Sequence, residues 1–304
     1  MKSFAFIITI AFFSSCTLKK ENNLDTHKII FLTSYYEEFV NAAKNLPTKG
    51  KDSCLRKMNE YLFIRYFNKC ENSWWFNDDP GGDTIHYSEG LKDLSKMIAL
   101  VKKNEDTIKA RIEKSFSNCY KYLPYDGMDI FINPSLMDEK SAIRMGGVTG
   151  FTPGSKHILI YIDPTIKNWE EKLEMAIAHE FNHTYWIKYN NDSYQNTLLD
   201  FMVCEGKAEA FSHLVYPKII NSWDTSLTEQ EKKKFWNEAK TKLDTKDYEF
   251  QQEFMFGGKK HPHCTGYILG RALVEAALKK CPNVEAKNWT NFSPDYILKE
   301  SGFK

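Results

Sequence analysis

The 304-residue sequence has almost no excess charge, no internal repeat and no low-complexity segment. Its 41 basic residues balance its 40 acidic ones, and the net charge of +1 gives no global drive toward nucleic acid or an acidic membrane surface. Without a repeat, there is no basis for a solenoid or a propeller. The share of hydrophobic residues, 42%, instead predicts a packed globular core.

The seven cysteines include no Cys-x-x-Cys pair, which disfavours a zinc site built from cysteines. Once Cys16 is set aside, an even number remains, which in an exported chain permits disulfides without choosing their pairing. The remaining cysteines are Cys54, Cys70, Cys119, Cys204, Cys264 and Cys281. Cys204 lies within an apolar helical pattern, and we expect it to be a buried thiol rather than a metal ligand.

The N-terminus carries an apolar run, residues 4–13, that is too short to cross a bilayer comfortably. Small residues directly before Cys16 resemble a bacterial lipoprotein signal, in which the cysteine is lipidated and becomes the new N-terminus. We therefore predict a signal peptide over residues 1–16, a lipidated Cys16 and a polar tether over 17–28. Phe13 stands where leucine is usual, so an uncleaved anchor or a plain secretory signal is the alternative. The expected location is the bacterial cell envelope, with a lipid anchor at the membrane; a secreted or periplasmic protein is the alternative.

The rest of the chain divides into a helical N-terminal region, residues 29–118, and a catalytic region, residues 119–304, in which strands precede helices. Segments 128–132 and 157–162 are rich in isoleucine and bounded by turn residues, which predicts two strands. The Gly-rich stretch between them, 146–154, lacks the Gly-Lys-Ser/Thr ending of a phosphate loop. We interpret the whole as a strand–loop–strand hairpin.

Helical periodicity dominates the sequence that follows. The expected helices cover residues 170–189, 197–215, 228–243 and 266–280. Thr197 and Asp200 form a capping-box-like pair at the start of the second of these helices. A small sheet followed by several helices predicts an α+β fold.

The residues that carry chemistry form the pattern His179-Glu180-Phe181-Asn182-His183, within the first of these helices. Two histidines four residues apart project from one helix face, where both imidazoles can bind one Zn²⁺. Glu180 lies beside the metal without having to bind it, which is the place of a general base. The surrounding helix is apolar, and a polar cluster within it needs a partner, for which zinc is the simplest candidate.

A zinc peptidase needs a third protein ligand and an open position for water. In gluzincins the third ligand is a glutamate on a following helix, and Glu205, next to Gly206, lies on the next predicted helix. We predict that Glu205 is the third ligand of a single zinc ion. Glu209 would share its helix face and accept the free N–H of a ligand histidine. The alternative exchanges the two glutamates, with Glu209 as ligand and Glu205 as its support.

These segments resemble the YjaZ-type family of predicted Zn-dependent proteases, which has a gluzincin-like HExxH…E pattern. The segments that carry the resemblance are His179-Glu180-Phe181-Asn182-His183, Glu205-Gly206-Lys207-Ala208-Glu209 and Gly266-Tyr267-Ile268-Leu269-Gly270. The resemblance covers roughly residues 120–280. It implies a zincin-like fold with a small sheet packed on the active-site helix, one zinc ion and peptidase activity. Gliding-motility lipoproteins of the GldB type are similar in being lipoproteins related to this group.

The predicted reaction is hydrolysis of a peptide bond by a metal-activated water, with Glu180 as general base and then as proton donor to the leaving amine. The developing oxyanion needs a further donor. Tyr267 is the first candidate and His263 the second, because both lie near the start of the predicted helix 266–280. Strand 157–162 would be the edge on which an extended peptide pairs. The expected partner is a peptide or protein substrate and not a nucleic acid, and the oligomeric state stays open.

Two other interpretations are compatible with the same residues. One is a non-catalytic envelope lipoprotein that keeps a zincin fold and binds zinc for binding or assembly; zinc without cleavage of any peptide in a broad library would favour it. The other is a structural zinc site with four protein ligands and no open position, in which His213 would be the extra ligand.

Overall fold

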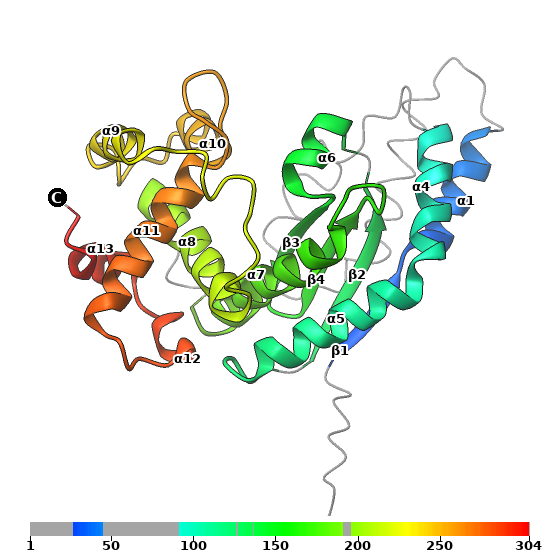
Figure 1. The fold of residues 1–304 in the computed structure, drawn as a ribbon, viewed down its shortest axis with the longest axis horizontal. Helices are drawn as coiled ribbons and strands as arrows, with labels where there is room; N and C mark the ends of the chain where they lie inside the picture. The colour runs from blue at the N-terminus through cyan, green and yellow to red at the C-terminus, as the bar shows by residue number, and fades with distance from the viewer. Residues whose placement is uncertain (1–26, 45–90, 126, 136, 191–195, 304) are drawn as a thin grey trace, which may run out of the picture.

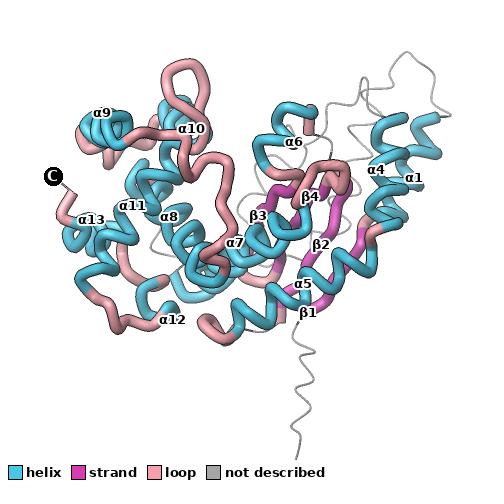
Figure 2. Tube along the Cα trace, viewed as in Figure 1, coloured by secondary structure: helices cyan, strands magenta, loops and turns pink. Residues whose placement is uncertain are grey.

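The computed structural model describes residues 27–44, 91–125, 127–135, 137–190 and 196–303. Within these residues, a small sheet lies in one half of the molecule and the helices of the C-terminal third make up the other half (Figure 1, Figure 2). The α+β fold is thus confirmed. The predicted signal peptide, Cys16 and most of the predicted tether lie outside the described residues.

The sheet has four strands in the order β1-β2-β4-β3. Their bounds are β1 His27–Phe31, β2 Met128–Pro134, β3 Val148–Gly154 and β4 His157–Ile162. Strands β1, β2 and β4 run parallel, and β3 pairs antiparallel with β4 at one edge. The near-continuous apolar sequence of β2 and β4 fits this arrangement, since parallel strands are buried on both faces.

Four expectations about this region are wrong. Strands β2 and β4 are parallel neighbours and form no hairpin, because helix α6 (Glu139–Met145) and β3 itself connect them. The Gly-rich stretch is mainly strand: Gly146 and Gly147 have positive φ angles of 67° and 78°, which let the chain turn from α6 into β3. Strand β4 is therefore internal, and β3 is the edge beside it. Residues 27 and 28, expected in the tether, belong to β1.

Helices cover both faces of the sheet. On one face, the isoleucines of β2 and β4 pack with α5 (Glu105–Tyr120) and α7 (Trp169–Asn190) in the main core. On the other face, Leu32, Phe131 and Leu159 pack with tyrosines of α1 (Thr33–Lys44), against which α4 (Leu91–Lys103) lies. This layering leaves α7 between the sheet and α8.

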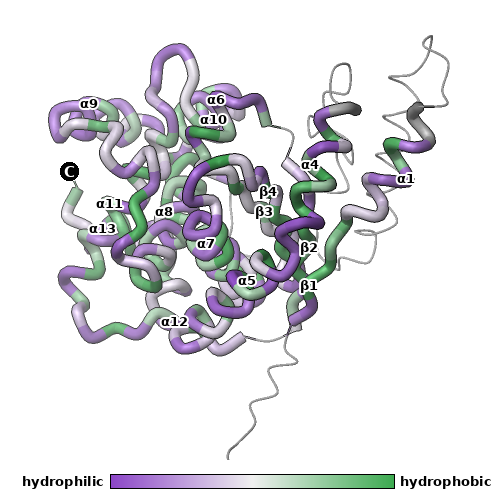
Figure 3. The backbone as a smooth tube through the Cα atoms, turned by 45° about the vertical axis from the view of Figure 1, so that its right-hand side comes forward, coloured by the Kyte–Doolittle hydropathy of each residue, from purple (hydrophilic) through white to green (hydrophobic). Residues whose placement is uncertain are grey.

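The helical half is organised around a close pair, α8 (Leu198–Val215) and α11 (Thr265–Lys280). At their crossing, a Cβ on Gly270 would collide with the backbone oxygen of Met202, so the two backbones can meet only through glycine. The remaining helices are α9 Glu229–Ala239, α10 Tyr248–Phe256, α12 Ala286–Trp289 and α13 Pro294–Ser301. The outer helix α9 is mostly hydrophilic along its length (Figure 3). All four predicted helices of this region are thus confirmed, as is the capping box of Thr197 and Asp200.

None of the helices in the described ranges is long and apolar enough to cross a bilayer.

Candidate metal centre

Helix α7, which carries the HExxH pattern, is fixed against α5 by a buried carboxylate. Glu174 accepts from Arg111 Nη1 at 2.6 Å and from Lys114 Nζ at 2.8 Å. The Ser115 hydroxyl donates to the Glu174 backbone oxygen at 2.7 Å. A largely buried carboxylate with two cationic partners strongly disfavours sliding of one helix along the other. The pattern is therefore held at one height relative to the sheet.

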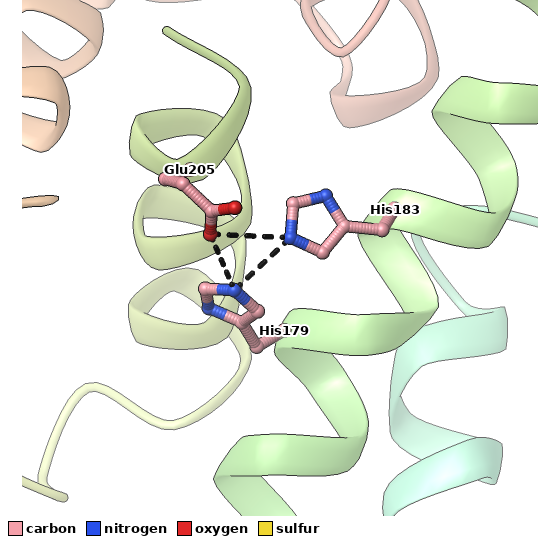
Figure 4. A group of neighbouring side chains, drawn as sticks. All are labelled: His179, His183 and Glu205. Carbon is pink, nitrogen blue, oxygen red and sulfur yellow. Dashed lines mark hydrogen bonds and ion pairs between the residues drawn. The ribbon is translucent and has the colours of Figure 1, made fainter. Parts of the chain in front are cut away.

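Helix α8 returns beside α7 and brings Glu205 opposite the two histidines (Figure 4). The Nε2 atoms of His179 and His183 are 3.1 Å apart. Glu205 Oε2 lies 3.1 Å from the Nε2 of His179 and 3.3 Å from that of His183. Three donor atoms from three side chains therefore converge on one point.

The donor set fits a zinc ion. Ligand atoms about 2.0–2.2 Å from one tetrahedral Zn²⁺ lie about 3.3–3.5 Å apart, close to the separations seen here. His179 Nδ1 lies 3.1 Å from the carboxylate of Glu209, which can only accept, so Nδ1 carries a proton and a neutral His179 turns the lone pair of Nε2 inward. With the lone pair of His183 Nε2 facing it, a cation between the two rings removes the repulsion.

Of the two glutamates considered from the sequence, Glu205 is the one that converges with both histidines, whereas Glu209 lies against the outer nitrogen, Nδ1, of His179. The other oxygen of Glu209 accepts from Asn221 Nδ2 at 3.3 Å and from the indole N–H of Trp223 at 3.4 Å. These two contacts hold the Glu209 carboxylate in place against His179. A carboxylate that accepts from the outer N–H of a metal-binding histidine orients the ring and raises its basicity.

His183 has a different outer neighbour. Its Nδ1 lies 3.6 Å from Sγ of Cys204, the residue before Glu205 on α8. Cys204 is a free, half-buried thiol, and Cys119, Cys264 and Cys281 are also free within the described part of the chain. Cys204 was expected to be a buried thiol rather than a metal ligand; it is half-buried, and it is not one of the three converging donors.

The charges of the three converging side chains are strongly coupled. Burial lowers the pKa of His179, but hydrogen bonds to Glu205 and Glu209 outweigh it and raise the pKa to about 10. Burial likewise opposes protonation of His183, yet the charge of Glu205 raises its pKa well above the ordinary value. Burial opposes ionisation of Glu205, but the two histidines hold its pKa far below the ordinary value. In the metal-free protein, protons therefore stand in for the positive charge that this cluster attracts.

Glu180 is buried, and its carboxylate lies against strand β3. The Thr152 hydroxyl lies 2.7 Å from Glu180 Oε2 and donates to it. A Cβ on Gly150 would lie 2.5 Å from Glu180 Oε1, so the carboxylate sits directly on the glycine. Burial raises the pKa of Glu180, and the neighbouring histidines and Thr152 offset part of this rise. A raised carboxyl pKa suits a group that must accept and release a proton near neutral pH.

Tyr267, in the first turn of α11, lies beside His179. Its ring is nearly parallel to that of His179, with the centroids 6.3 Å apart. Burial and the surrounding carboxylates raise the pKa of its phenol well above the ordinary value, so it stays protonated and able to donate.

His263 is directed elsewhere. Its Nδ1 lies 2.9 Å from the backbone oxygen of Phe256 and its Nε2 lies 3.3 Å from Sγ of Cys264. Both ring nitrogens are therefore occupied within its own loop. Of the two oxyanion donors predicted from the sequence, the structure brings Tyr267 to the cluster and does not bring His263 to it.

His213 does not join the three converging donors. It belongs to a separate group with Glu209 and Asp224, in which its Nε2 lies 3.3 Å from Asp224 Oδ1. The same Asp224 oxygen accepts from Arg271 Nη1 at 2.9 Å. A guanidinium on that oxygen already supplies the positive charge there. The interpretation with four protein ligands including His213 finds no support in this arrangement.

Behind the ligands, two side chains attach α7 and α8 to the C-terminal segment. Asn182 Nδ2 donates to Thr290 Oγ1 at 3.0 Å. The ammonium of Lys207 donates to the backbone oxygens of Thr290 at 2.9 Å and Phe292 at 2.5 Å. Burial lowers the pKa of Lys207 to about 8. Both residues lie within two positions of a converging donor, yet they serve packing on the opposite side of the helices.

Several contributors were not found by sequence reasoning: Gly150, Thr152, Asn221, Trp223, Asp224 and Arg271. All of them except Arg271 lie in segments without helical periodicity, so no local sequence pattern indicated their contacts with the motif. The one available signal was the glycine-rich composition of 146–154, which permits close approach of another group to the backbone.

A helix with two histidines four residues apart, completed by a glutamate from the next helix, defines a three-donor metal centre of the HExxH class. The chain belongs to the family described as "Predicted Zn-dependent protease (DUF2268)", whose model matches residues 108–299. No curated protein and no solved structure matched the chain.

Proposed function

We propose that this protein is a zinc-dependent peptidase with a zincin-like fold. The observation that carries the proposal is the convergence of His179, His183 and Glu205 beside a buried Glu180 that is not part of their triangle. A purely structural zinc site needs a fourth protein ligand, and no fourth His, Cys, Asp or Glu of the described chain completes this group. Family membership supports the same conclusion.

Zinc held by these three side chains would lower the pKa of a bound water and polarise the scissile carbonyl. Glu180 would accept the proton of that water, hold it and deliver it to the leaving nitrogen. The Tyr267 phenol would donate a hydrogen bond to the carbonyl oxygen as negative charge develops on it. Burial and the surrounding carboxylates raise the pKa of the phenol and keep it protonated for this purpose.

The edge strand β3 is the proposed binding edge for an extended substrate. Asp163 N–H donates to the Gly147 backbone oxygen at 2.7 Å, which marks Gly147 and Asp163 as a hydrogen-bonded pair of the antiparallel ladder. Val148 and Gly150, which pair with Ile162 and Ile160, therefore turn their backbone groups away from β4. A substrate strand added there would pass beside Glu180.

The test is zinc analysis combined with cleavage of a broad peptide library by wild type and Glu180→Gln. We expect one zinc per chain in both proteins, with cleavage lowered by about 10²–10⁴-fold in the variant. Full cleavage by Glu180→Gln with zinc bound would show the mechanism to be wrong. Zinc without any cleavage by wild type would favour a non-catalytic binding protein.

We further propose that residues 1–16 are a lipoprotein signal and that lipidated Cys16 anchors the protein in the cell envelope, in keeping with a relation to GldB-type lipoproteins. The support is the short apolar run followed by small residues and a cysteine. Mass spectrometry of the mature N-terminus tests this proposal, because a processed chain would begin at a lipidated Cys16.

A further inference from the structure

The side chain of Glu180 is held by β3, the strand that we propose as the binding edge for the substrate. One oxygen, Oε2, accepts from the Thr152 hydroxyl at 2.7 Å, and the Thr152 hydroxyl also lies 3.2 Å from the Glu180 backbone oxygen. The other oxygen, Oε1, lies over Gly150 at a distance that leaves no room for a methyl group. The two carboxylate oxygens are thus in different surroundings.

We propose that Thr152 is a positioning residue for Glu180, and that Gly150 provides the space in which the carboxylate lies. Thr152 holds Oε2 through a short hydrogen bond to a charged acceptor, which is stronger than one between neutral groups. Oε1 is left as the oxygen that accepts and returns the proton. This inference rests on the proposed peptidase function and adds to it the residues that orient the base.

Gly150 also affects how a substrate strand would lie relative to Glu180. Its backbone N–H and C=O turn away from β4, toward the open edge where a substrate strand would pair, while its missing side chain makes room for Glu180. Its φ angle lies outside the positive range, so glycine is required here by space and not by backbone conformation. The same residue therefore places the substrate backbone and the base relative to each other. An alanine at this position would push the carboxylate off Thr152.

The experiment compares Thr152→Val, which removes the hydroxyl at nearly constant shape, with Thr152→Ser, which keeps it. Thr149→Val is the matched control, because Thr149 lies on the same strand but on the opposite face from Gly150. We expect Thr152→Val to lower kcat about 10- to 100-fold with little change in KM and with zinc content intact. Thr152→Ser should restore kcat to within about threefold of wild type, and Thr149→Val should leave it unchanged.

A second measurement does not depend on activity. Crystal structures of Thr152→Val and Thr149→Val should show the Glu180 carboxylate rotated or in two positions in the first variant only. Wild-type kcat in Thr152→Val, or an unmoved carboxylate in its crystal structure, would overturn the inference. If wild type cleaves no peptide, the proposed function fails, and the carboxylate position alone then decides whether Thr152 orients Glu180.

Discussion

The candidate centre lies between two regions of the molecule that contribute different things. The helical region, through α8 and α11, supplies Glu205, Glu209 and Tyr267 around the two histidines of α7. The sheet region, through Thr152 and Gly150 of β3, contacts the carboxylate of Glu180. In the proposed function, holding the metal and moving the proton therefore depend on separate parts of the chain. Substitutions should therefore separate the two properties.

Loss of Glu205 should have the largest effect. Glu205→Gln removes the anionic donor shared by both histidines, so zinc affinity should fall by more than the roughly 10–100-fold expected for a residue that only supports a ligand. Competition with a chromophoric chelator measures this loss. Glu180→Gln alters the carboxylate that β3 contacts and leaves the three converging donors in place, so this variant should bind zinc as tightly as wild type. Equal affinity loss in both variants would mean that the two regions are not separable.

The pH dependence of zinc binding follows from the charges of the helical side. The pKa of His179 is raised to about 10 and that of His183 well above its ordinary value, so the pair holds at least one extra proton at neutral pH in the metal-free protein. Zinc requires neutral rings, so its binding displaces protons. Apparent affinity should therefore rise with pH between 6 and 8, by about tenfold per pH unit for each proton released. An affinity independent of pH over this range would contradict the cluster described here.

Glu209 should have an intermediate effect. Glu209→Gln leaves an acceptor for the His179 N–H but removes the charge that makes the ring a better ligand, so zinc affinity should fall by about 10–100-fold. Glu229→Gln, the same acid-to-amide change at an exposed position of α9, is the control and should keep the affinity near wild type. Unchanged zinc affinity in Glu209→Gln would show that the charge of Glu209 does not support His179 as a ligand.

The close crossing of α8 and α11 should affect stability more than metal binding. Alanine normally favours a helix over glycine by about 0.5–1 kcal/mol. At Gly270 the added methyl meets the backbone oxygen of Met202, which cannot rotate away, and overpacking of this kind costs about 1–3 kcal/mol or more. Gly270→Ala should therefore lower the free energy of unfolding, measured by urea denaturation, while Lys279→Ala on the exposed face of α11 should change it little.

The helical side could be predicted from sequence far better than the sheet side, and the reason is physical. The capping box of Thr197 and the four-residue spacing of the histidines are local signals, and the two helices that carry them, α8 and α7, formed as expected. Strand β3 has two glycines and a proline among its seven residues, which are poor strand formers, and its place beside β4 is set by pairing and by the packing of Glu180. Parallel pairing of β2 with β4 likewise joins residues with no local relation.

The smallest predicted effect compares two helices that begin in the same way. Thr197 starts α8, which carries Glu205, and Thr228 starts α9, which carries none of the converging donors; each forms a capping box. Thr197→Ala and Thr228→Ala should each cost about 1 kcal/mol of stability in urea denaturation, because each frees a backbone N–H at a helix start. Only Thr197→Ala should also weaken zinc binding, by a few-fold at most, because the helix whose start it loosens, α8, carries Glu205. A matching loss of zinc affinity in Thr228→Ala would show that the effect reflects general stability and not the helix that holds the ligand.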